Sequence, residues 1–277
     1  MVGSLLEVGL KLKLSEAYAA IRNVEFVALS VLWAFVICPA LALLLTKIIP
    51  LAEPYAVGLI LLGMTPAAPF FPMMAGRAGG DFAYAAAFML IAYFGTVFFM
   101  PVATPFLLPT FKADAWTIAK PLMIYITAPL AAGVLIRAHA EALASRMHPV
   151  VKKVTAADAL IMLALVLWIY GAEFLNAVGT FAIGSQLLFY TIVAIATYAS
   201  AVRLPNSQRN ILTLGLCTRN VGATFAPLVA VPGTDARAIA MVALAVPLTV
   251  ACALLFATVL TRFSSKSDKL IMHQVAP

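Results

Sequence analysis

Residues 215–228 read GLCTRNVGATFAPL, and they place Thr218, Arg219 and Asn220 inside a long apolar segment. Arg219 lies ten residues after Arg209 and 16 before Asp235. At about 1.5 Å of rise per helical residue, it would lie ~15 Å into a bilayer, near the midplane. Ionisable side chains at that depth usually face the interior of a helix bundle and mark a pathway or a counter-ion.

The composition is that of an integral membrane protein. The 277 residues are 64% hydrophobic and 10% charged, with a mean hydropathy of +1.04, whereas a soluble domain is about 25% charged. About 20 apolar residues cross the hydrocarbon, and each charge at a helix centre costs roughly 3 kcal/mol. Eight spans are expected. Five of them contain no Asp, Glu, Lys or Arg: 26–46, 54–76, 82–111, 174–202 and 238–261. The other three are apolar stretches that contain charged residues: 118–137, 156–176 and 208–230.

The opening residues MVGSLLEVGLKLKL are apolar but short, and they lack the basic n-region and small-residue cleavage site of a signal peptide. We expect them to be a fragment of a ninth helix. The three cysteines, Cys38, Cys217 and Cys252, fall within predicted spans without a CxxC or Cys/His pairing, so we expect buried thiols and neither a disulfide framework nor a metal site.

The distribution of basic residues predicts the topology. If residues 138–155 are cytoplasmic, alternation through the spans puts 13 of the 18 Lys and Arg residues inside. The positive-inside rule then explains the basic charge, and no nucleic-acid partner is needed. We expect a multi-pass protein of a bacterial inner membrane, one domain over 1–277, with a cytoplasmic tail at 263–277.

Two segments form a weak internal repeat. LLGMTPAAPFFPMMAGRAGGDFAYAAA (61–87) and TLGLCTRNVGATFAPLVAVPGTDARAIA (213–240) both have an interruption followed by Gly-x-Asp and an Ala-rich helix. The topology runs them in opposite directions, and Pro66, Pro69 and Pro72 prevent an unbroken helix in the first. Interrupted helices in two inverted halves indicate a secondary-transporter site. We expect an all-α polytopic membrane protein with an inverted-repeat secondary-transporter fold, two broken, crossing helices, and halves at about 1–137 and 150–262.

The acidic residues near these segments have ordinary explanations. Asp81 and Asp235 each precede an Ala-rich helix, where an N-cap is expected. Arg219 has two interpretations. It could recognise an anion, or it could be a structural tie that pairs with a carboxylate such as Glu173 or with carbonyls of a broken helix.

At these residues the sequence resembles the bile acid:sodium symporter family over nearly its whole length. The resemblance implies ten helices in two inverted five-helix repeats, with broken helices crossing at the binding site, and a shortened or incomplete start here. The family pattern Pro-Gly-Gly-x-x-Ser-Asn, followed by a small-x-Gly-Asp/Asn turn, and the pattern Glu-x-Gly-x-Gln-Asn align with the following residues: Pro66, Ala67, Ala68, Phe71, Pro72, Ala78, Gly80 and Asp81, and Gly215, Cys217, Arg219 and Asn220.

The departures from the family pattern form a consistent set. Phe71 and Pro72 replace Ser-Asn, Gly215 replaces Glu, and Arg219 replaces Gln. Oxygen ligands and a negative charge suited to sodium are lost, and one positive charge is gained. The resemblance therefore implies the fold and the place of the site, while the departures argue against sodium coupling.

We expect a secondary transporter of a small or amphipathic organic anion, because a guanidinium pairs with a carboxylate or sulfonate through two hydrogen bonds. One alternative keeps sodium, bound by backbone carbonyls with Thr65, Thr218 and Asn220. Another is a non-transporting membrane sensor or assembly subunit. An enzyme is not expected, since HExxH, GxSxG and paired acids are absent from the sequence. The expected binding residues are Thr65, Pro66, Ala68, Phe71, Pro72, Cys217, Thr218, Arg219 and Asn220.

Overall fold

The computed structural model describes residues 2–111 and 113–275, with side chains in the last helix as far as Arg262. Over these residues the expected all-helical fold class is confirmed. The helices are α1 (Val2–Lys11), α2 (Leu14–Ile21), α3 (Val24–Leu32), α4 (Cys38–Ile48), α5 (Glu53–Gly63), α6 (Phe71–Arg77), α7 (Phe82–Leu107), α8 (Ala115–Leu122), α9 (Ala128–His139), α10 (Glu141–Asn176), α11 (Ala182–Ser200), α12 (Asn206–Cys217), α13 (Val221–Ala230) and α14 (Ala236–Val275).

Six stretches of the described chain are long and apolar enough to span a membrane: Val24–Ile48, Phe82–Leu107, Ala115–His139, Glu141–Asn176, Ala182–Ser200 and Ala236–Arg262. The other two expected spans, 54–76 and 208–230, are the ones with interruptions, and each is split into two short helices. The protein is therefore a multi-pass membrane protein. The opening segment is helical, as α1.

Prolines shape two of the continuous spans. The π-helical turn Trp33–Ile37 lies just before Pro39, and the π-helical turn Met123–Thr127 lies just before Pro129. Proline has no N–H and its ring displaces the carbonyl four residues earlier, so the preceding turn widens instead of keeping regular α-helical bonding.

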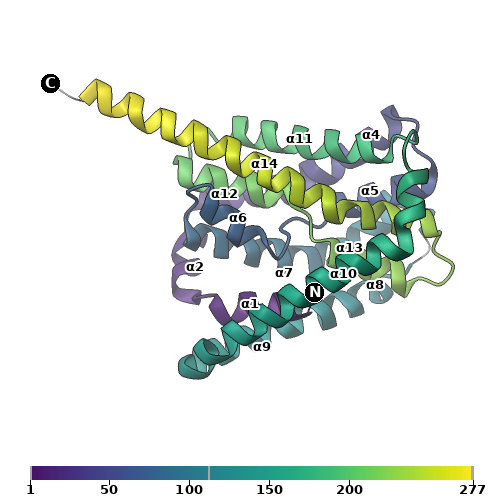
Figure 1. Ribbon diagram of the computed structural model, residues 1–277, viewed down its shortest axis with the longest axis horizontal. Coiled ribbons are helices and arrows are strands. Elements are labelled where there is room, and N and C mark those ends of the chain that lie inside the picture. The colour runs from purple at the N-terminus through teal and green to yellow at the C-terminus, as the bar shows by residue number, and fades with distance from the viewer. Residues whose placement is uncertain (1, 112, 276–277) are drawn as a thin grey trace.

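Two segments differ from the expected boundaries. The connection at 138–155 is helical from Glu141 onwards, because α10 extends 36 residues and only Ala140 separates it from α9. The segment expected as a tail continues α14 to Val275, and its end projects beyond the other helices (Figure 1). Residues 276–277 of that segment lie outside the described residues. The expected caps are confirmed: Asp81 accepts a hydrogen bond from the Ala83 N–H and Asp235 from the Arg237 N–H.

The two split spans run in opposite directions through the bundle. Helices α5 and α13 lie toward one end of the molecule, and α6 and α12 lie toward the other (Figure 1). At the α6 and α12 end, the Thr261 hydroxyl donates to the Arg77 carbonyl, and the Asn23 side chain donates to Gln208. We call this the basic end, because it gathers the helix ends that carry Lys11, Lys13, Arg22, Arg77 and Arg209.

Helix α1 packs directly on α9 through a pair of glycines. A Cβ atom on Gly9 would lie 2.5 Å from the Leu130 carbonyl oxygen, and one on Gly133 would lie 2.6 Å from the Leu6 carbonyl oxygen. Both contacts are with backbone atoms, which cannot rotate away. The two helices approach this closely only because both positions are glycine, as in small-residue contacts between membrane helices.

We expect Gly133→Ala to destabilise the protein by about 1–3 kcal/mol, the usual cost of overpacking. The new methyl group would have to separate α1 from α9. The melting temperature of the purified protein in detergent checks this. The matched control is Gly171→Ala in α10, where a Cβ would have no neighbour within 4 Å. A melting temperature of Gly133→Ala no lower than that of the control would contradict the contact.

Candidate functional site

The breaks in the two split helices meet, as the sequence predicted, and they pair through their backbones. The Ala67 N–H donates to the carbonyls of Gly215 and Thr218, at 3.0 Å each, and the Asn220 N–H donates to the Thr65 carbonyl at 2.8 Å. Pro66 and Arg219 face each other in an antiparallel bridge. Backbone N–H and carbonyl groups that lack a partner within one broken helix thus form hydrogen bonds with the other broken helix. The interior of a membrane protein requires such pairing.

The backbone at Ala67 explains one feature of the family pattern. Ala67 has a φ of 63°, in the left-handed region that glycine adopts most readily. The resemblance places a glycine at this position. Here an alanine keeps the same conformation, held by its two backbone hydrogen bonds across the crossover.

The threonine and asparagine side chains of the crossover are engaged in local bonds. The Thr65 and Thr224 hydroxyls lie 2.7 Å apart, and the Thr218 hydroxyl donates to the Leu214 carbonyl at 2.9 Å. Asn220 caps α13, since its side-chain oxygen accepts from the Ala223 N–H at 3.1 Å. The oxygens expected to offer ligands to a cation therefore already stabilise the ends of the broken helices.

Arg219 is the largest fully buried side chain of the described residues, with an exposure of 0%. Its guanidinium donates to the Gly63 carbonyl at 3.3 Å and to the Cys38 sulfur at 3.2 Å, and it lies 4.8 Å from the centre of the Phe189 ring. Gly63 is the last residue of α5, so the cation lies at the negative end of a helix dipole.

Within the described part of the chain, no carboxylate forms an ion pair with Arg219. The expectation of a tie to Glu173 is therefore wrong for these residues, whereas the tie to a broken-helix carbonyl is confirmed by the Gly63 bond. Two donors nevertheless stay without acceptors in the structure, the Nε of Arg219 and the side-chain nitrogen of Asn220. Both belong to fully or almost fully buried residues.

Aromatic rings pack at the start of α6 and beside Gly215. Phe71 is fully buried, and its ring packs edge-on against Phe88 at a centroid distance of 5.7 Å. A Cβ atom on Gly215 would lie 2.3 Å from the Phe88 ring. The place that a glutamate side chain would need, according to the family pattern, is thus occupied by Phe88.

The structure brings together most of the expected site residues. Thr65, Pro66, Ala68, Cys217, Thr218, Arg219 and Asn220 are buried at the crossover, while Phe71 and the half-buried Pro72 begin α6 beside it. Cys38, Phe88, Phe189 and Thr224 contact these residues and were missed. They lie in spans with unremarkable apolar sequences, and only the packing of the helices shows their role. The expected buried thiols are confirmed, as all three cysteines are free and buried.

The comparisons with known proteins agree with this architecture. Residues 1–177 match the sodium bile acid symporter family, and no curated protein matches the chain. That match covers more than half of the chain, so the protein belongs to the sodium bile acid symporter family, a family of transporters and not of enzymes. Membership implies a secondary transporter of small organic solutes. The matched region includes α5 and α6, and the second broken helix lies beyond it.

The contact between Gly215 and Phe88 gives a direct test of the packing. We expect Gly215→Ala to destabilise the protein by about 1–3 kcal/mol, because the new methyl group meets a buried ring. Phe88→Leu should make room for it, so the double variant should lose less stability than the two single losses together. Melting temperatures of the four proteins of this double-mutant cycle give the coupling. Purely additive losses would contradict the contact.

Proposed function

We propose that this protein is a secondary transporter of a small or amphipathic organic anion, with its site at the crossover of the broken helices. The observation that carries the proposal is Arg219, a buried cation without a carboxylate partner among the described residues. Its own Nε and the side-chain nitrogen of the neighbouring Asn220 have no acceptors there. Buried charges and buried donors are costly unless they are paired. An anion with several oxygens would supply what this arrangement lacks.

The opposite directions of the two split helices support an inverted-repeat transporter fold. In such folds, half-helix ends point at a site near the bilayer midplane, and one group of helices rocks against the other around it. Helix α6 begins at Phe71 and α13 at Val221, so the positive ends of two half-helices adjoin the crossover. They would add to the attraction between Arg219 and an anion.

We further propose that Arg219 takes the place of a coupling cation. Its guanidinium neutralises the carbonyl end of α5 at Gly63, and Phe88 occupies the space that a side chain on Gly215 would need. Sodium is a hard cation that needs several oxygen ligands. Phe71, Pro72 and Gly215 lack the side-chain oxygens that the family pattern has at these positions, which disfavours the sodium-coupled alternative.

Transport should accordingly not depend on sodium. We expect uptake of organic carboxylates and sulfonates, a bile acid among them, into proteoliposomes to be equal within about twofold in sodium and choline gradients, because a fixed guanidinium already supplies the charge. The measurement is the initial rate of labelled uptake. A rate at least tenfold higher with sodium would show that the cation is still bound and that Arg219 does not replace it.

Counterflow separates this carrier from a non-transporting sensor or assembly subunit. Vesicles loaded with an unlabelled substrate should accumulate the labelled substrate from outside without any ion gradient. A sensor would bind the substrate and exchange none across the membrane. Vesicles with an unrelated membrane protein at the same density serve as the control. Binding without counterflow for every anion tested would reject the transport function.

A further inference from the structure

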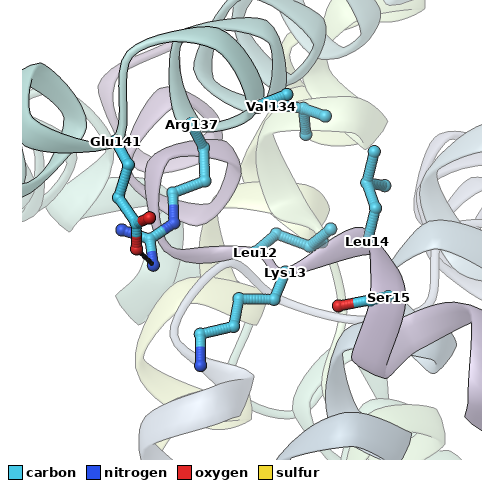
Figure 2. Close-up of a pocket in the computed structure, with 8 residues that line it drawn as sticks. Leu12, Lys13, Leu14, Ser15, Val134, Arg137 and Glu141 are labelled. Atoms are coloured by element: carbon cyan, nitrogen blue, oxygen red, sulfur yellow. Dashed lines mark hydrogen bonds and ion pairs between the residues drawn. The ribbon is translucent and has the colours of Figure 1, made fainter.

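A cavity of about 230 Å³ lies at the basic end, where α1 passes into α2 and where α9 passes into α10. Charged groups of Lys13, Arg137 and Glu141 lie on one side of it, and Val134 and Leu14 lie on the other (Figure 2). Its residues come from three helices and their connections, far from the crossover in sequence. None of its lining residues belongs to the crossover, so it is a different site from the proposed transport site.

The glycine contact between α1 and α9 lies close in sequence to both cations of the cavity. Lys13 lies four residues after Gly9, and Arg137 lies four residues after Gly133. Arg137 therefore lies about one helical turn along α9 from the contact. Lys13 follows the end of α1 at Lys11, in extended backbone as the N-cap of α2, and both residues line the same cavity. The side chain of Arg137 is only 18% exposed, which limits its mobility.

The polar groups of the cavity favour an anion. Arg137 donates to Glu141 at 2.8 Å and to Ser145 at 3.4 Å, and Lys13 donates to Glu16 at 2.9 Å. Both acidic partners are at least half exposed, and such exposed ion pairs contribute little free energy. The first turn of α2 also has no side-chain cap. Phosphate oxygens could accept hydrogen bonds from both cations. Breaking the two exposed ion pairs would cost little free energy.

We propose that this cavity binds the phosphate group of an anionic phospholipid. Basic pockets between membrane helices bind lipid headgroups, each cation near an anionic surface contributing about 1 kcal/mol. Leu14 and Val134 give the cavity an apolar side against which an acyl chain can lie. The bound phosphate would join the start of α2, which packs on α7, to the end of α9, which packs on α1.

Native mass spectrometry of the full-length protein tests this site. The protein is released from nanodiscs that contain equal amounts of phosphatidylglycerol and phosphatidylcholine, and the retained lipids are counted. We expect selective retention of phosphatidylglycerol by the wild type. The double variant Lys13→Gln with Arg137→Gln should retain at least about fivefold less, since two cations are lost. Lys13 is exposed and Arg137 is half-buried, and the melting temperature of the double variant shows that it is folded.

The matched control is Arg146→Gln, which removes an exposed cation from α10 outside the cavity. Retention by this variant should equal that of the wild type. An equal loss in Arg146→Gln, or equal retention of both lipids by the wild type, would overturn the proposal. Retention should persist in millimolar inorganic phosphate, because Leu14 and Val134 also contact the acyl chain. Complete release would show that only the phosphate group is bound and would overturn the lipid site.

Discussion

The backbone pairing between residues 65–67 and 215–220 is the interaction on which the rest of the structure depends. Two helices can break inside a membrane only where their unpaired N–H and carbonyl groups find partners. Here each break supplies partners for the other, through three hydrogen bonds of 2.8–3.0 Å. The pairing explains why two polar interruptions occur in one chain, and it brings Arg219 to the centre of the bundle.

Arg219 then determines the chemistry of the crossover. It contacts a helix-terminal carbonyl, a thiol and an aromatic face, and it contacts no carboxylate of the described chain. The carbonyl, the thiol and the aromatic ring stabilise the guanidinium without neutralising its charge. The same residue therefore acts as a structural tie through Gly63 and keeps a net charge, which is the basis of the proposed anion site. The centre of the Phe189 ring lies 4.8 Å from the buried guanidinium, and such an apolar surrounding strengthens electrostatic interactions.

Much of the architecture could be predicted from the sequence, because membrane spans follow from apolar length and the breaks follow from proline and polar residues. The spans around Pro66–Pro72 and Arg219 were placed correctly, and so were the caps at Asp81 and Asp235. The helical connection after Ala140 was missed, since its charged residues resemble those of a loop. Phe88, Phe189 and Cys38 were missed because their role depends on contacts between distant helices, which a single apolar sequence does not encode.

The most direct test of the central claim is the affinity of purified Arg219→Met for an organic anion that the wild type binds, measured by isothermal titration calorimetry. Methionine keeps most of the buried volume and removes the charge, whereas Arg219→Lys keeps the charge without the bidentate geometry. Loss of a buried charged partner typically costs about 2–5 kcal/mol of binding. We predict a loss of well over tenfold for Arg219→Met and a partial recovery in Arg219→Lys. An affinity of folded Arg219→Met equal to that of the wild type would show that the arginine is only a structural tie.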